Sequence, residues 1–180
     1  MGVRWRVAAG WSIDLFVGER TRDHHDLEIE VPRADHARVR RHLGLQPYAA
    51  GDGELRRMGV DDPLPEGGFQ SWCFDPVAER WRIDLMAVPG DDDTWVYRRD
   101  ESLTAPLAWM VAETDDGIPY LRPHGTLLYK GLSSGGIRPK DDADLETCLP
   151  RMTADERAWL AESLSRFRPD HPWTRKISGC

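Results

Sequence analysis

The sequence predicts an α+β protein with a strand-rich N-terminal part and a helical C-terminal part. Two patterns carry this prediction. From Asp26 to Val31 acidic and aliphatic residues alternate strictly, which is the period of a strand with one acidic and one apolar face. Toward the C-terminus three segments instead have helical character. We therefore expect a core over residues 1–120 and a helical part over residues 121–180 that packs on it.

The N-terminal part alternates strands with two short helices. Gly10 opens the first helix, over residues 11–17, and Gly18 ends it; Gly44 ends the second, over residues 33–43. Residues 49–68 hold five glycines and two prolines, and therefore predict a loop or a weak hairpin. The remaining strands are expected at Val3–Ala8, Phe69–Phe74, Trp81–Val88 and Thr94–Arg98.

The C-terminal part reads as three helices. Thr153 with Glu156 three residues later has the form of a capping box, so the third helix begins there. The three expected ranges are Pro123–Gly131, Lys140–Leu149 and Thr153–Phe167.

Composition narrows the function classes. Lys and Arg number 24 against 31 Asp and Glu, so the 180-residue chain carries a net charge of −7. This balance disfavours a nucleic-acid partner and suits a small cationic or neutral molecule. No apolar run approaches the roughly 20 residues of a membrane span, and the N-terminus lacks the apolar core of a signal peptide. Three distant cysteines (Cys73, Cys148 and Cys180) form no Cys-x-x-Cys pair, so the expected location is the reducing cytoplasm.

The residues between Gly10 and Glu28 carry the clearest chemistry. A strand runs into a small-residue turn that opens a helix, and a helix start with free N–H groups binds phosphate. Asp26 and Glu28, two residues apart on the next strand, project from one face. Asp84 is a lone acid in an apolar run, where an unpaired charge is costly. The three carboxylates therefore predict a Mg²⁺ site, although Arg82 on the same face as Asp84 leaves a simple salt bridge open.

At this point the sequence resembles a known family. Gly10-Trp11-Ser12-Ile13-Asp14-Leu15, followed by Gly18 and Thr21-Arg22-x-His24-x-Asp26-x-Glu28, is similar to the antibiotic nucleotidyltransferases of the polymerase-beta-type superfamily, which include aminoglycoside 2″-adenylyltransferases and lincosamide nucleotidyltransferases. Later segments share this likeness, which spans roughly residues 7–173. They are Asp116-Gly117-Ile118-Pro119-Tyr120-Leu121, Leu127-Leu128-Tyr129-Lys130, Arg138-Pro139-Lys140-Asp141-x-x-Asp144 and His171-Pro172-Trp173.

The resemblance implies a mixed sheet flanked by helices and a Mg²⁺-dependent, pyrophosphate-releasing transfer of a nucleoside monophosphate from a triphosphate such as ATP to a hydroxyl. Asp26 and Glu28 would be metal ligands, and Asp84 a third ligand or the base that accepts the hydroxyl proton. The acceptor would be a small hydroxylated molecule such as an aminoglycoside or lincosamide antibiotic. The residues expected to bind the nucleotide are Gly10, Trp11, Ser12, Arg22, His24, Lys130 and Lys140.

The sequence departs from the family pattern at three places. Ala9-Gly10 replaces a glycine pair, Asp-x-Glu replaces Asp-x-Asp, and His124 follows Pro123 where relatives often carry an acid. A degenerate nucleotide-binding relative, or a transferase that acts on protein or RNA, therefore stays an alternative. A zinc or iron site at His24-His25-Asp26 has no second ligand cluster to support it. The acid clusters in the loops, at Asp61-Asp62, Glu66 and Asp91-Asp92-Asp93, favour a cationic acceptor if those loops border the metal strands.

Overall fold

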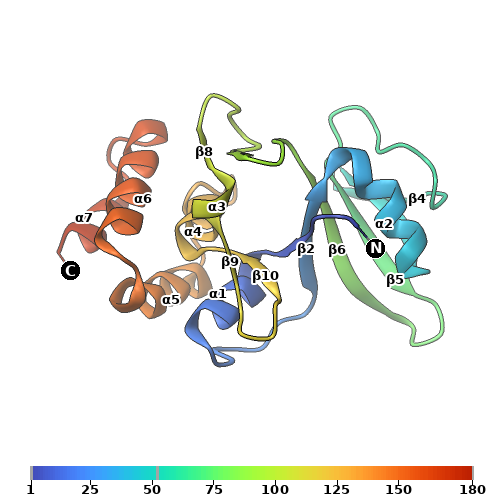
Figure 1. Cartoon of the computed structure of the whole chain (residues 1–180), viewed down its shortest axis with the longest axis horizontal. Helices are drawn as coiled ribbons and strands as arrows, with labels where there is room; N and C mark the ends of the chain where they lie inside the picture. The colour runs from blue at the N-terminus through green and yellow to red at the C-terminus, as the bar shows by residue number, and fades with distance from the viewer. Residues whose placement is uncertain (1, 52, 180) are drawn as a thin grey trace. The chain divides into compact units, whose positions relative to one another are not determined.

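The computed structural model describes residues 2–51 and 53–179, so Cys180 lies outside it. The chain divides into two compact units (Figure 1). Unit 1 comprises the N-terminal residues up to Ala8 together with His24–Trp109, and unit 2 comprises Ala9–Asp23 with Met110 and the residues after it. The division differs from the predicted boundary at residue 120, because the first helix and the segment after it group with the C-terminal residues.

Unit 1 is built on a mixed sheet with the strand order β4-β3-β5-β6-β2-β1. The central strands β2 (Leu27–Pro32) and β6 (Arg80–Val88) are parallel, and their other neighbours are antiparallel. The outer strands are β1 (Arg6–Val7), β3 (Gln46–Gly51), β4 (Glu54–Arg57) and β5 (Gln70–Asp75). The expected mixed sheet is thus confirmed.

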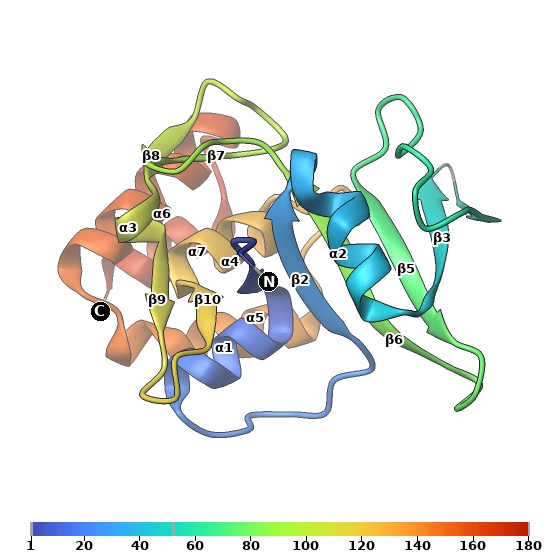
Figure 2. The same ribbon diagram turned by 45° about the vertical axis from the view of Figure 1, so that its right-hand side comes forward.

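A helical segment covers one face of this sheet. The 3₁₀ turn η1 (Arg33–Asp35) leads into α2 (His36–Leu43), which lies against the sheet in both ribbon views (Figures 1 and 2). Gly44 ends α2 with φ +64, as its position at the end of the predicted helix requires. Between α2 and the sheet lies an apolar core that includes Val3, Val31, Val39, Cys73 and Leu85.

The sequence analysis left residues 49–68 as either a loop or a weak hairpin. The structure contains a hairpin here, because β3 and β4 pair antiparallel. A second, two-stranded sheet joins β7 (Thr94–Val96) to β8 (Thr104–Pro106). The sequence predicts β7 but not β8, which is too short to show a period of its own. Trp95 in β7 and Tyr97, the residue after β7, are each only 1% exposed, so buried aromatic side chains hold this small sheet in place.

Unit 2 consists of helices and one hairpin. The helices are α1 (Ala9–Val17), α4 (Pro123–Gly131), α5 (Pro139–Cys148), α6 (Ala154–Phe167) and α7 (Pro172–Ser178), with the 3₁₀ turn η2 (Leu149–Arg151) after α5. The short α3 (Leu107–Met110) lies where the division between the units falls, and β9 (Val111–Glu113) pairs antiparallel with β10 (Pro119–Leu121). The predicted helices match α1, α4, α5 and α6, and Thr153 and Glu156 form the predicted capping box. The sequence analysis missed α7 and the hairpin.

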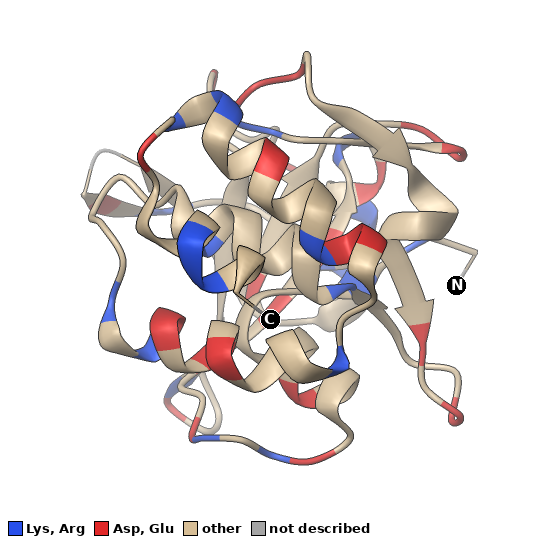
Figure 3. Cartoon of the chain, turned by 90° about the vertical axis from the view of Figure 1, so that its left-hand side faces the viewer, with Lys and Arg blue, Asp and Glu red and all other residues tan. Residues whose placement is uncertain are grey.

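The motif His171-Pro172-Trp173 fastens α7 to the rest of unit 2. The His171 Nε2 lies 2.9 Å from the Gly131 carbonyl oxygen, and the Trp173 indole donates to Asp142 at 2.8 Å. Trp173 is fully buried, and a Cβ on Gly131 would lie 3.1 Å from its ring. Ion pairs from Lys176 to Asp142 and Glu146 add to this contact, and Figure 3 shows acidic and basic segments mixed on the helices of this face. None of the described helices has the length and apolarity needed to cross a bilayer.

Ala9, at the start of α1, has φ +51, a left-handed conformation that favours glycine. We predict that Ala9→Gly stabilises the protein by about 0.5–1 kcal/mol. The variant relieves roughly 1–2 kcal/mol of left-handed strain but adds about 0.4–1 kcal/mol of freedom to the unfolded chain. Chemical denaturation measures the difference. Ala8→Gly is the control, because Ala8 is buried and has no positive φ, so glycine there lowers the stability. Equal effects of the two substitutions would contradict the prediction.

Candidate active site

The parallel pairing of β2 with β6 places two of the predicted acids side by side. Glu28 and Asp84 are direct Cα partners in this register, so their side chains leave the same face of the sheet. Asp26 precedes β2 by one residue and has the parity of Glu28. Glu30, the next acid of this face, is only 4% exposed and pairs with Arg6 at 2.6 Å. Glu30 therefore forms an internal ion pair, whereas Asp26 and Glu28 lie near Asp84.

Asp84 lies in an environment that disfavours its charge. Burial, followed by the neighbouring charges of Glu28 and Asp26, raises its pKa to about 7. Its Oδ1 atom is buried without a hydrogen-bond partner among the described residues. The salt bridge that Arg82 could have supplied does not form, because Arg82 pairs with Asp75 at 3.1 Å.

This arrangement fits a divalent cation in its chemistry. Hard carboxylate oxygens are the ligands that Mg²⁺ prefers, and a cation would satisfy the Asp84 oxygen and offset the repulsion among the three acids. Within the described residues, no three His, Cys, Asp or Glu side chains are already gathered as a ligand cluster. The Mg²⁺ site formed by Asp26, Glu28 and Asp84 therefore stays a prediction.

The sequence analysis missed one cation near these acids. The Arg98 guanidinium stacks on the Phe69 ring, with its carbon 3.4 Å from the ring centroid, and its charge acts to lower the pKa of Asp84. Arg98 follows β7 in the aromatic stretch Trp95-Val96-Tyr97. Its only sequence signal was its place at the end of a predicted strand, which does not show what it faces.

The start of α1 belongs to unit 2. Gly10 and Ser12 are buried, and the Ser12 hydroxyl lies 2.7 Å from Thr126 Oγ1 and donates to the Ala9 carbonyl at 2.9 Å. Trp11 is partly exposed. The Ser12 side chain thus links α1 to α4 within the unit. Phosphate binding by Gly10, Trp11 and Ser12 stays a prediction.

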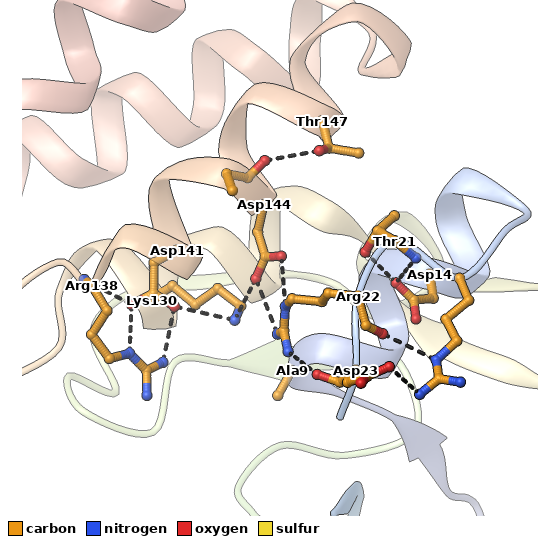
Figure 4. Close-up of polar contacts among 12 residues, drawn as sticks. Ala9, Asp14, Thr21, Arg22, Asp23, Lys130, Arg138, Asp141, Asp144 and Thr147 are labelled. Atoms are coloured by element: carbon orange, nitrogen blue, oxygen red, sulfur yellow. Dashed lines mark hydrogen bonds and ion pairs between the residues drawn. The ribbon is translucent and has the colours of Figure 1, made fainter. Parts of the chain in front are cut away.

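Lys130 on α4 belongs to a network of ion pairs around two buried carboxylates (Figure 4). The other members of this network come from α5, from the residue before α5 and from the segment after α1. The Lys130 Nζ lies 2.8 Å from Asp144 and 3.3 Å from Asp141, both on α5. Arg22 pairs with the other side of Asp144, and Arg138 with Asp141. The structure thus brings two predicted nucleotide contacts, Lys130 and Arg22, to one carboxylate.

Three other residues singled out by the sequence lie in different settings. Lys140 is exposed on α5, and His24 is partly buried in the segment before β2. His124 is fully buried, its Nδ1 3.5 Å from Glu156, and burial lowers its pKa to about 4. It is therefore a neutral side chain of the unit 2 interior.

The acid-rich loops use many of their carboxylates locally. Asp91 accepts backbone hydrogen bonds from Asp93 and Thr94, and Asp92 pairs with Arg4. Asp62 accepts from the Gly59 amide at 2.6 Å, and Asp61 pairs with Arg41 at 2.6 Å. These contacts give the clusters a structural use in turns and ion pairs, and they weaken the electrostatic case for a cationic acceptor.

The two acid-rich loops border cavities of different size. The hairpin β3–β4 and residues 65–69 enclose about 350 Å³ in unit 1. Residues 89–91 border about 20 Å³. The larger cavity is lined by Ala49, Ala50, Gly51, Glu54, Arg56, Pro65, Glu66, Gly67, Gly68 and Phe69.

The chain has an α+β nucleotidyltransferase fold, as its likeness to solved structures shows. It is similar to the lincosamide antibiotic adenylyltransferase LnuA, solved with lincomycin bound, with a TM-score of 0.54 and 16% identity over 81% of this chain and 85% of that chain. It is also similar to ANT(2'')-Ia in complex with adenylyl-2''-tobramycin, with a TM-score of 0.55 and 16% identity over 92% of this chain and 89% of that chain.

A family model for aminoglycoside-2''-adenylyltransferase matches residues 1–61. No curated protein matches the sequence. The matched range contains the α1 motif together with Asp26 and Glu28. The predicted resemblance to the antibiotic nucleotidyltransferases is therefore confirmed.

The raised pKa of Asp84 predicts a pH-dependent stability. Between pH 4 and 7 the folded protein keeps a proton on Asp84 that the unfolded chain has lost, so the metal-free protein loses stability as the pH rises through this window. Asp84→Asn has no such proton to lose. We predict that its advantage over wild type grows by about 1–2 kcal/mol from pH 5 to pH 8, measured by unfolding in a chelator.

Asp75→Asn is the matched control on the neighbouring strand. Backbone hydrogen bonds from Ala78 and Val77 and the contact with Arg82 lower the pKa of Asp75. Its amide variant should therefore be destabilised to a similar degree at both pH values. Parallel pH profiles for wild type and Asp84→Asn would contradict the prediction.

Proposed function

We propose that the protein is a nucleotidyltransferase that transfers a nucleoside monophosphate from a Mg²⁺-bound nucleoside triphosphate to a hydroxyl of an aminoglycoside or lincosamide. The observation that carries this proposal is the pairing of Glu28 with Asp84 in the β2–β6 register, with a buried, unpartnered Asp84 oxygen. The fold and the family match over residues 1–61 support the reaction class.

In the proposed reaction the acceptor oxygen forms a bond to the α-phosphorus of the triphosphate. The bond from that phosphorus to the bridging oxygen breaks, and pyrophosphate leaves. When bound, Mg²⁺ would supply charge neutralisation on the phosphate oxygens. Asp26 and Glu28 would hold it, and Asp84 would join them or take the hydroxyl proton. A pKa of about 7 gives Asp84 the affinity for a proton that a general base needs near neutral pH.

The nucleotide would be bound by the residues that the sequence analysis singled out for this role. The start of α1 presents backbone N–H groups, which favour phosphate, and Arg22 and Lys130 add positive charge. His24 and Lys140 complete the proposed set. Arg98 in unit 1 is a further cation near the acids, and it would limit their repulsion toward a polyanion.

The acceptor would occupy the cavity between the β3–β4 hairpin and residues 65–69. Its volume of about 350 Å³ lies within the range of small-molecule sites. LnuA, by its description, was solved with lincomycin, and ANT(2'')-Ia with adenylyl-2''-tobramycin. These neighbours make an antibiotic the first acceptor class to test, and the mixed charges of the face in Figure 3 give no basic stripe for RNA.

Pyrophosphate release tests this function. We expect Mg²⁺-dependent release from a triphosphate in the presence of one member of an aminoglycoside and lincosamide panel, with a nucleoside monophosphate added to that acceptor in the mass spectrum. Asp84→Asn should lower kcat by about 10²–10⁴-fold, the range for loss of a general base. Asp26→Asn and Glu28→Gln should also lower kcat, because each removes a proposed metal ligand.

Glu162→Gln serves as the control, because this exposed acid of α6 is not among the residues proposed to bind the metal, the nucleotide or the acceptor. It should keep kcat. Triphosphate binding without turnover for any acceptor would instead establish the degenerate, nucleotide-binding alternative.

A further inference from the structure

We infer that Asp144 is a positioning residue for phosphate binding, because it fixes two cations, Arg22 and Lys130, side by side. This inference rests on the proposed function. It assigns to a buried acid of α5 a role that its charge alone would oppose, since an isolated carboxylate repels a triphosphate.

Asp144 is held on two sides. The Arg22 guanidinium approaches it side-on, with Nε 3.2 Å from Oδ1 and Nη2 3.4 Å from Oδ2. The Lys130 Nζ lies 2.8 Å from Oδ2. Asp144 is 3% exposed and Lys130 is 7% exposed, whereas 24% of the Arg22 side chain is accessible. Two like charges that would otherwise repel are therefore kept together by one carboxylate, and Arg22 is the more accessible of the two.

The segment that carries Arg22 depends on this contact for its position. After α1 ends at Gly18, Thr21 donates to the Asp14 carboxylate from its amide at 3.1 Å and from its hydroxyl at 2.5 Å. The next residue is Arg22, bound to Asp144. The turn is thus fastened at adjacent residues, first to its own helix and then to α5.

Asp141 provides the comparison within the same network. It lies one helical turn before Asp144, is fully buried, and also contacts Lys130, at 3.3 Å. Its other partner is Arg138, which binds it with Nε at 2.7 Å and Nη2 at 2.9 Å. Arg22, Lys130 and Arg138 against Asp141 and Asp144 leave the network with one excess positive charge. The two acids therefore differ in that Asp144 holds Arg22, whereas Asp141 holds Arg138 and accepts its backbone N–H at 3.1 Å at the start of α5.

The experiment compares Asp144→Asn with Asp141→Asn in the full chain, using inorganic tripolyphosphate with Mg²⁺ as the probe and calorimetry as the readout. Each variant removes one negative charge from the same network, so simple electrostatics predicts equal or tighter binding in both. Positioning predicts that Asp144→Asn weakens binding by about 10-fold to 100-fold, because a misplaced binding group loses that much, while Asp141→Asn does not weaken it.

Thermal unfolding of both variants separates this effect from a loss of stability. If Asp144→Asn does not fold, Arg22→Lys replaces it: the charge stays, but the two-point contact with Asp144 is lost, and binding should weaken to a similar degree. With an active protein, the same variants should raise KM for the triphosphate more than they lower kcat.

The outcomes distinguish this inference from the proposed function. Wild-type binding that Asp144→Asn leaves unchanged or strengthens, or that both variants weaken in proportion to their lost stability, would overturn the inference alone. A wild-type protein that does not bind tripolyphosphate would overturn the proposed function and the inference together.

Discussion

The parallel pairing of β2 with β6 is the constraint on which the rest of the candidate site depends. Strands that pair in parallel need a long connection, and residues 33–79 supply it with α2 and the strands β3 to β5. The hydrophobic core beneath this pair, with Val31 and Leu85, fixes the register, because a slip by one residue would turn every side chain to the other face. That same register sets Glu28 beside Asp84. The packing of apolar residues thus holds acids together that would separate in water.

Such an arrangement has a cost that is informative about function. A buried carboxylate oxygen without a partner, next to two further acids, destabilises a folded protein. Three other acids of unit 1 each have a partner. Glu30 pairs with Arg6, Asp75 pairs with Arg82, and Asp62 accepts a hydrogen bond from the Gly59 amide. The exception at Asp84 is therefore a local feature, and a bound cation would remove its cost.

In unit 2, in contrast to Asp84, two buried acids have cationic partners. Asp141 and Asp144 each hold two cationic partners, and the network joins α4, α5 and the segment after α1. Several residues that carry the family resemblance likewise hold segments of unit 2 together. Thr21 and Arg22 fasten the turn after α1, while His171 and Trp173 fasten α7. Part of the shared motifs therefore fixes the framework of unit 2 through contacts within the protein.

The sequence by itself determined the local elements, and it indicated the reaction class that we propose. Sequence patterns placed β2, β6 and five helices to within a few residues, since they report which residues share a face and where an element ends. The motif around Gly10 and Asp26 indicated a resemblance to the antibiotic nucleotidyltransferases, which the match over residues 1–61 and the likeness of fold then confirmed. The strands β8, β9 and β10, of three residues each, escaped prediction, because three residues with no longer extended run around them display no period.

Only the tertiary structure decided which partner each charge has. The sequence could not show that Arg82 turns to Asp75, that Lys130 and Arg22 share Asp144, or that Arg98 stacks on Phe69. These pairs join residues up to 122 positions apart. The grouping of residues 9–23 with the C-terminal helices was equally invisible, because α1 packs against segments more than 100 residues away in the sequence, as the contact of Ser12 with Thr126 illustrates. Spacing along a chain fixes which residues share one face of an element, whereas long-range pairing depends on how whole elements pack.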